Sequence, residues 1–70
     1  MIAIELILER IKITRTEKGI RQEELAEALG IDRTTYLRKE SGQIPLSVEE
    51  LLKIAEALDT NPAYFFKEGH

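Results

Sequence analysis

The chain has 70 residues, with ten Lys and Arg, thirteen Asp and Glu, and a net charge of −3. This length allows one small domain over residues 1–70, and 43% hydrophobic residues exclude disorder by composition. The absence of cysteine excludes disulfides and thiolate sites and suits a reducing, cytoplasmic setting. No apolar run approaches the roughly 18 residues of a membrane span, and the opening MIAIELIL lacks the basic start of a signal peptide.

The charge is distributed unevenly along the chain. Residues 10–43 carry eight basic and six acidic side chains, whereas the remaining residues carry two basic and seven acidic ones. The net charge argues mildly against a phosphate-binding protein, but the basic centre leaves that function open. Chance patchiness on a solvated surface explains the pattern about as well.

The first predicted helix covers residues 4–18. At 100° per residue, Ile4, Leu8, Ile11 and Arg15 fall on one stripe, with Ile7 beside it. A second apolar stripe, on the opposite side, consists of Ile2, Leu6 and Ile13. Residues 1–7 form an apolar extension that also alternates as a strand would. This extra apolar surface favours contact with a second copy of the chain. The alternative is an apolar surface that no partner covers.

Two short helices are expected next, over residues 22–29 and 33–40. Gly30 ends the first because glycine tolerates a positive φ, and Asp32 is a good N-cap for the second. Leu25 and Leu29 share one face of the first, with Ala26 beside them, and Ile31 forms an apolar plug in the turn. Two helices joined by so short a glycine-containing turn form a helix-turn-helix, here over about residues 22–40.

The C-terminal third predicts two more helices. Ser47 to Glu50 is a capping box that starts a helix after the loop around Pro45. Its expected wide apolar face comprises Val48, Leu51, Leu52, Ile54, Ala55 and Leu58. Asn61 and Pro62 are expected to begin a last short helix that carries Tyr64, Phe65 and Phe66.

Several short motifs carry a resemblance to a known family. They are Lys18-Gly19-Ile20, Gln22-Glu23-Glu24-Leu25-Ala26, Leu29-Gly30-Ile31, the residues Tyr36, Glu40 and Gly42, and LLKIAEAL. Residues 8–66 thereby resemble the Cro/lambda-repressor type of helix-turn-helix DNA-binding transcriptional regulators. The resemblance implies a compact all-α domain of four to five helices and double-stranded DNA as the partner.

Helix geometry identifies the side chains that would face the DNA. Thr34 and Arg38 project opposite Tyr36 and Lys39, Leu37 flanks them, and Arg33 leans beyond the first turn. We expect Arg33, Thr34, Leu37 and Arg38 to contact base edges in a major groove about 12 Å wide. By resemblance Gln22 would hold a phosphate, with further phosphate contacts from Arg21, Ser41 and Gln43. Arg21 stands where the family often has a Ser or Thr cap, so a helix cap is missing.

Arg15 and Glu40 are expected to form a structural ion pair. Both occupy core-facing positions, where an unpaired charge costs several kcal/mol. The resemblance suggests the same pairing. Arg15 is therefore interpreted as scaffold first and DNA contact second.

The resulting hypothesis is a sequence-specific regulator, by default a repressor, that binds a palindromic operator as a homodimer. The candidate dimer residues are Ile2, Leu6, Ile13 and Phe66. Contact with RNA polymerase through Glu23, Glu24 and Glu27 stays open. The alternative function is a protein-interaction or antitoxin-like module. No enzyme, cofactor or metal site is expected, because the only His is His70 and no phosphate-binding Gly loop is present.

Overall fold

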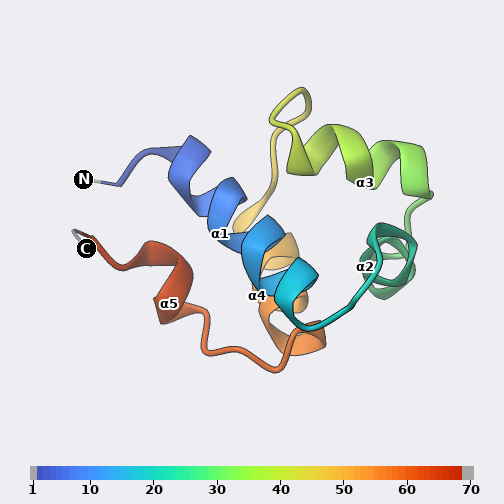
Figure 1. Ribbon diagram of the computed structural model, residues 1–70. Coiled ribbons are helices and arrows are strands. Elements are labelled where there is room, and N and C mark those ends of the chain that lie inside the picture. Colours follow the sequence, from blue (N-terminus) through green and yellow to red (C-terminus); the bar gives the residue numbers. More distant parts are fainter. Residues whose placement is uncertain (1, 69–70) are drawn as a thin grey trace.

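The secondary structure of residues 2–68, which the computed structural model describes, is entirely helical (Figure 1). The helices are α1 (Ile4–Glu17), α2 (Gln22–Leu29), α3 (Arg33–Glu40), α4 (Val48–Ala57) and α5 (Ala63–Phe66). The predicted all-α class and the five-helix order are confirmed. Helices α2 and α3 have the predicted bounds, and α1 ends one residue early because Lys18 is its C-cap.

One hydrophobic core joins all five helices. Its buried members are Ile7, Leu8, Ile11, Leu25, Ala26, Tyr36, Leu51, Ile54, Ala55, Leu58 and Phe65. Helix α1 runs through the middle of Figure 1, in front of α4, with α5 on one side and α2 and α3 on the other. Each helix therefore contributes one to three of these side chains to a common centre rather than forming a core of its own.

The chain is helical from Ile4, so the alternative of an extended start, in which Ile2, Ile4, Leu6 and Leu8 alternate as in a strand, is wrong from that residue on. Ile7, Leu8 and Ile11 are buried, as a helical stripe requires. Ile4, which shares that stripe, is half exposed, contrary to expectation. It lies in the first turn of α1, one turn before the first buried residue. The core therefore covers a shorter part of the stripe than the sequence suggests.

The turn between α2 and α3 is built around Gly30. Its φ is +73°, in the left-handed region that strains other residues. The Ile31 backbone N–H donates to the Ala26 carbonyl at 3.0 Å, which closes the end of α2, and the Ile31 side chain packs against the core. Asp32 then accepts a 2.7 Å hydrogen bond from the Thr35 backbone N–H and starts α3. These few residues fix the direction in which α3 leaves α2.

The predicted capping box of α4 is present. Ser47 Oγ accepts from the Glu50 N–H, and Glu50 Oε1 accepts from the Ser47 N–H, both at 3.0 Å. The apolar face of α4 is narrower than predicted, because Val48 is 68% exposed and Leu52 is also exposed. Only Leu51, Ile54, Ala55 and Leu58 enter the core.

Arg10 in α1 and Lys18 at its C-terminal end both donate hydrogen bonds to the C-terminal half of the chain. Arg10 donates to the carbonyls of Tyr64 and Phe65 at 3.3 Å, and also to that of Lys67, at the end of α5. Lys18 donates to the carbonyl of Leu58, at the end of α4. Positive charge is favourable at these helix ends because their carbonyls have no partner within the helix.

Candidate nucleic-acid interface

Helix α3 lies at the edge of the molecule and packs on α1 and α2 through one side only (Figure 1). The centre of that inner side is Tyr36, whose side chain is almost completely buried. The remaining surface of α3 faces away from the other helices. One side of α3 is thus packed against other helices, and the opposite side is exposed to solvent.

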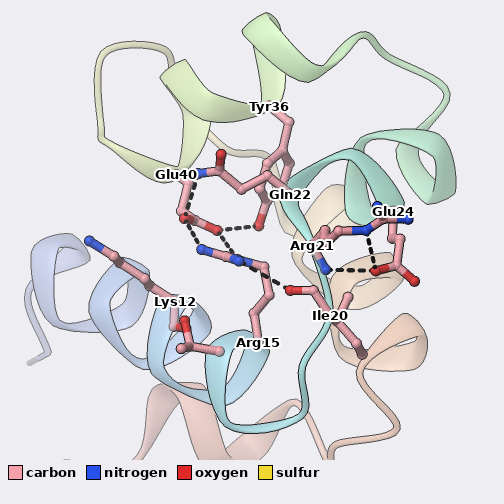
Figure 2. Close-up of polar contacts among 9 residues, drawn as sticks. Lys12, Arg15, Ile20, Arg21, Gln22, Glu24, Tyr36 and Glu40 are labelled. Carbon is pink, nitrogen blue, oxygen red and sulfur yellow. Dashed lines mark hydrogen bonds and ion pairs between the residues drawn. The ribbon is translucent and has the colours of Figure 1, made fainter.

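The inner side is anchored by hydrogen bonds that converge on Glu40 (Figure 2). The Arg15 guanidinium donates twice, from Nε to Oε2 and from Nη2 to Oε1, each at 3.0 Å. Tyr36 Oη donates to Oε2 at 2.7 Å, and Gln22 Nε2 donates to Oε1 at 3.2 Å. Arg15 also donates to the Ile20 carbonyl at 3.1 Å. The ion pair expected from the sequence is therefore present, within a larger network that joins α1, α2 and α3.

The network stabilises the charged form of Glu40. Burial by itself raises the pKa of a carboxyl group, but the hydrogen bonds from Arg15, Tyr36 and Gln22 outweigh burial and hold the Glu40 pKa below its usual value. Burial raises the pKa of Tyr36, and its hydrogen bond to Glu40 raises it further. The tyrosine therefore remains a proton donor to a permanently charged acceptor at neutral pH.

Lys39 anchors α3 in the other direction, which the sequence did not reveal. Its Nζ lies 3.1 Å from Glu50 Oε1 and 3.1 Å from the Pro45 carbonyl oxygen. Glu50 is also the residue that caps α4, so one carboxylate links the end of α3 to the start of α4. The hydrogen bond from the Ser47 backbone and the contact with Lys39 both keep the pKa of Glu50 low. A Lys and a Glu eleven residues apart give no periodic signal, so only the fold brings them together.

The outer side of α3 carries the predicted base contacts, Arg33, Thr34, Leu37 and Arg38, and all four are exposed. Leu37 keeps 47% of its surface accessible. Within residues 2–68, the guanidinium groups of Arg33 and Arg38 make no hydrogen bond or ion pair. The structure thus places two arginines without hydrogen bonds or ion pairs, a hydroxyl and an apolar side chain on the exposed side of α3.

The start of α2 supplies the predicted phosphate contacts Arg21 and Gln22. The Gln22 side chain is turned inward onto Glu40, so its backbone rather than its amide group faces solvent. Arg21 has no cap acceptor, as expected, and Glu24 Oε2 accepts from the Arg21 backbone N–H at 2.7 Å instead. A shallow groove of about 550 Å³ lies here. It is lined by Arg15, Arg21, Gln22, Glu23 and Arg33.

The loop after α3 presents Ser41 and Gln43, and both side chains are exposed. Ser41 Oγ donates to the Arg38 carbonyl at 3.1 Å, and the Gln43 backbone N–H donates to the same carbonyl at 2.8 Å. These residues line a second groove of about 690 Å³ between α1 and this loop, together with Lys12. Exposed polar groups therefore flank both ends of α3.

The predicted dimer residues lie away from this surface. Leu6 and Ile13 on α1 and Phe66 on α5 are exposed, whereas Ile2 is half-buried against the core. Leu6 and Ile13 flank Arg10 at helical spacing, and Arg10 holds α5. In Figure 1, α5 lies across α1 from α2 and α3. Helix α5, which carries Phe66, thus lies on the other side of α1 from α2 and α3.

Residues 2–68 contain no cluster of three or more His, Cys, Asp or Glu side chains with metal-binding geometry. Nor does any helix among them combine the length and the apolar character needed to cross a bilayer.

Comparison with known proteins identifies the family. The profile of the helix-turn-helix family matches residues 11–65, which include all of α2 and α3 and the core around them. The chain belongs to this family. An SPbeta prophage-derived HTH-type transcriptional regulator of Bacillus subtilis (strain 168) is 34% identical over 62 residues, which are 89% of the chain and 57% of the relative. An HTH-type transcriptional regulator of Rickettsia prowazekii (strain Madrid E) is 36% identical over 59 residues, 84% of the chain and 45% of the relative.

This helix-turn-helix chain thus spans about half the length of these two relatives. A solved structure is similar over more of its own length. The crystal structure of the restriction-modification controller protein C.AhdI from Aeromonas hydrophila shares 40% identity and a TM-score of 0.76, over 86% of this chain and 87% of that one. The resemblance inferred from the motifs is confirmed at the level of family and fold.

Proposed function

We propose that the protein is a sequence-specific DNA-binding regulator of transcription, with α3 placed in the major groove. The observation that carries this proposal is the contrast between the anchored inner side of α3 and its outer side, where the Arg33 and Arg38 side chains make no hydrogen bond or ion pair within residues 2–68. The family match and the transcriptional regulators among the relatives support the same function.

The dimensions of α3 suit this role. A helix of eight residues is about 12 Å long, and the major groove is about 12 Å wide. Arg33 and Arg38 would each bond the O6 and N7 atoms of a guanine, and Leu37 and the Thr34 methyl group would contact thymine methyl groups. Because the first turns of such a helix point into the groove, Arg33 and Thr34 would lie deepest.

Phosphate contacts would flank the helix at both ends. At one end, Arg21 and the backbone of Gln22 line the groove at the start of α2. At the other, Ser41 and Gln43 follow α3 directly. Such contacts fix the register of a protein on the duplex but carry no sequence information themselves. They also allow a protein with a net charge of −3 to bind DNA, because only this surface has to be favourable to the phosphates.

The regulator would act as a homodimer on a palindromic operator and repress by occluding it. Two copies of α3 would then enter successive major grooves about 34 Å apart. The exposed apolar residues Leu6, Ile13 and Phe66, together with the half-buried Ile2, are proposed to form the interface. Measuring the native mass tests this assembly. We expect a dimer for the wild-type protein and a monomer for the Leu6→Asp variant.

The decisive experiment is selection of bound sequences from a random DNA pool, followed by affinity measurements over a range of salt concentrations. We expect a two-fold symmetric consensus and a strong decrease of affinity with salt. Arg38→Gln should weaken binding to the selected site by at least about tenfold. Lys53→Gln, which removes the same charge from α4, is the matched control and should bind nearly as wild type. Failure to enrich any sequence would contradict the proposal.

A second candidate function is a protein-interaction module. Four large apolar side chains on α1 and α5 favour it: Leu6, Ile13, Tyr64 and Phe66 are all exposed. This function predicts a stable complex with another protein and no protected DNA sequence. The selection experiment and the native mass together separate the two candidates.

A further inference from the structure

Arg21 differs from the other exposed arginines near α3, because acidic neighbours already engage it. Its Nη1 lies 3.0 Å from Glu23 Oε1, and its Nε lies 3.5 Å from Glu24 Oε2. The pair is on the surface: the Arg21 side chain is 73% exposed and that of Glu23 is 55% exposed. By contrast, Arg33 lines the same groove without any hydrogen bond or ion pair within the described residues.

The two carboxylates around Arg21 have different local roles. Glu24 also accepts the hydrogen bond of the Arg21 backbone N–H and so caps α2, and its contact with the guanidinium is the longer one. Glu23 does not accept a hydrogen bond from the backbone at the start of α2. The interaction that it makes is the 3.0 Å ion pair with the Arg21 guanidinium. Glu23 is also the one carboxylate that lines the groove, among Arg15, Arg21 and Arg33.

On the basis of the proposed function, we propose that Glu23 competes with DNA phosphate for Arg21. In the free protein the Glu23 carboxylate forms an ion pair with the Arg21 guanidinium. On the duplex, a phosphate oxygen replaces that carboxylate, and Glu23 turns to solvent. Glu23 thereby lowers the affinity for DNA of every sequence, whereas Arg33 and Arg38 determine which sequence is preferred.

The chemistry of the pair makes this exchange feasible. Carboxylate and phosphate oxygens present the same acceptor geometry to the fork of an arginine. An exposed ion pair contributes little to stability, so giving it up does not disturb the fold. A phosphate contact on DNA gains in addition from the release of condensed counterions, which a carboxylate on the protein surface lacks. The phosphate is therefore favoured at low salt and the carboxylate regains the guanidinium as salt increases.

A double-mutant cycle tests the proposal. Affinities of wild type, Glu23→Gln, Arg21→Gln and the double variant are measured for the selected operator and for a scrambled duplex, across salt concentrations. Glu23→Gln should strengthen binding to both duplexes by about threefold and leave the slope of log K against log salt nearly unchanged at low salt, because wild type makes the same phosphate contact. Arg21→Gln removes that contact and should make the slope shallower by about 0.9. In the Arg21→Gln background, Glu23→Gln should change the affinity and the slope no more than the control substitution Glu27→Gln does. Glu27→Gln removes an equal charge from the exposed side of α2 and serves as the matched control.

The proposal is overturned by each of the following outcomes. Equal strengthening by Glu23→Gln in both Arg21 backgrounds would show that Glu23 simply repels DNA. An unchanged affinity would show that Arg21 remains paired or plays no part. Wild type that binds no duplex at any salt concentration would refute the proposed function and this inference together, whereas wild-type binding without coupling would refute the inference alone. Urea denaturation of each variant verifies that the fold is retained.

Discussion

The two sides of α3 differ in whether their polar groups are engaged. On the inner side, Glu40 is bonded to α1 and α2, Lys39 is bonded to α4 and the loop before it, and the Tyr36 hydroxyl donates to Glu40. On the outer side, Arg33 and Arg38 make no hydrogen bond or ion pair within residues 2–68, and Leu37 has little to pack on. One short helix therefore has one side that determines its position and another that remains available for a partner.

This difference teaches that position and recognition are separable in the protein. A helix of eight residues is marginal by itself, so its geometry has to come from tertiary contacts. The ion pairs at Glu40 and Lys39 supply those contacts in two directions. Substitutions on the inner side should therefore change stability first, whereas those on the outer side should change DNA binding alone.

The largest effect is expected at the centre of the inner side. Glu40→Ala leaves the nearly buried Arg15 guanidinium and the Tyr36 hydroxyl without their acceptor, which should lower the free energy of unfolding by about 3 kcal/mol. Urea denaturation at pH 7 measures this loss. Glu40→Gln, which keeps an acceptor oxygen, is the control and should lose less. Equal stability of wild type and Glu40→Ala would show that the network does not hold α3.

The next effect is expected at the turn that directs α3. A Cβ at residue 30 would meet no other atom within 4 Å, so the cost of Gly30→Ala is conformational, about 1–2 kcal/mol for the left-handed φ of +73°. Gly30→Asn should cost less, because asparagine adopts this region more readily. Thermal unfolding of both variants gives the order. A loss as large for Asn as for Ala would mean that the strain argument is wrong.

A smaller effect is expected from acid. The pKa of Glu40 is lower in the folded protein than in the unfolded chain, so the folded state binds fewer protons and stability increases with pH. The contribution of Glu40 is complete above the ordinary carboxyl pKa and is lost as pH falls through the lowered folded pKa. Stability measured between pH 7 and pH 3 should therefore fall less steeply in Glu40→Gln than in wild type. Parallel curves would contradict the assigned direction.

The smallest effect on stability is expected on the outer side. Leu37→Ala removes a side chain with few neighbours and should change the free energy of unfolding by less than about 0.5 kcal/mol. The same variant should bind the selected operator roughly tenfold more weakly, because it loses apolar contact with the bases. Affinity and urea denaturation on one preparation test both statements. A stability loss comparable to that of Glu40→Ala would abolish the distinction between the two sides.

The sequence predicted the parts of the fold that depend on local chemistry. Gly30, Asp32 and Ser47 each act within a few residues of their own position, and the helix bounds around them were predicted correctly. The pairing of Arg15 with Glu40 could be predicted because Arg15 lies on the apolar stripe of α1, Glu40 lies on the Tyr36 side of α3, and the family resemblance suggests the same pairing. In each case the reason for the structure lies in the neighbouring sequence.

The sequence did not predict features that depend on which helices meet. Val48 and Leu52 continue an apolar pattern, but no neighbouring helix covers that side of α4, so both remain exposed. The ion pair between Lys39 and Glu50 and the bonds from Arg10 to α5 join surfaces that only the assembled fold brings together. The outer side of α3 was identified from the sequence, but its contacts with DNA remain a prediction.

The most direct test of the account pairs one side chain with one base pair. Affinities of wild type and Arg38→Gln are measured for the selected operator and for every single-base substitution within it. We predict that wild type loses affinity on substitution of one guanine and that Arg38→Gln no longer distinguishes that base, a coupling of about 1–3 kcal/mol, while discrimination at the other positions is unchanged. A variant that binds every duplex more weakly by the same factor would show that Arg38 contacts the backbone, and that the outer side of α3 does not determine the sequence.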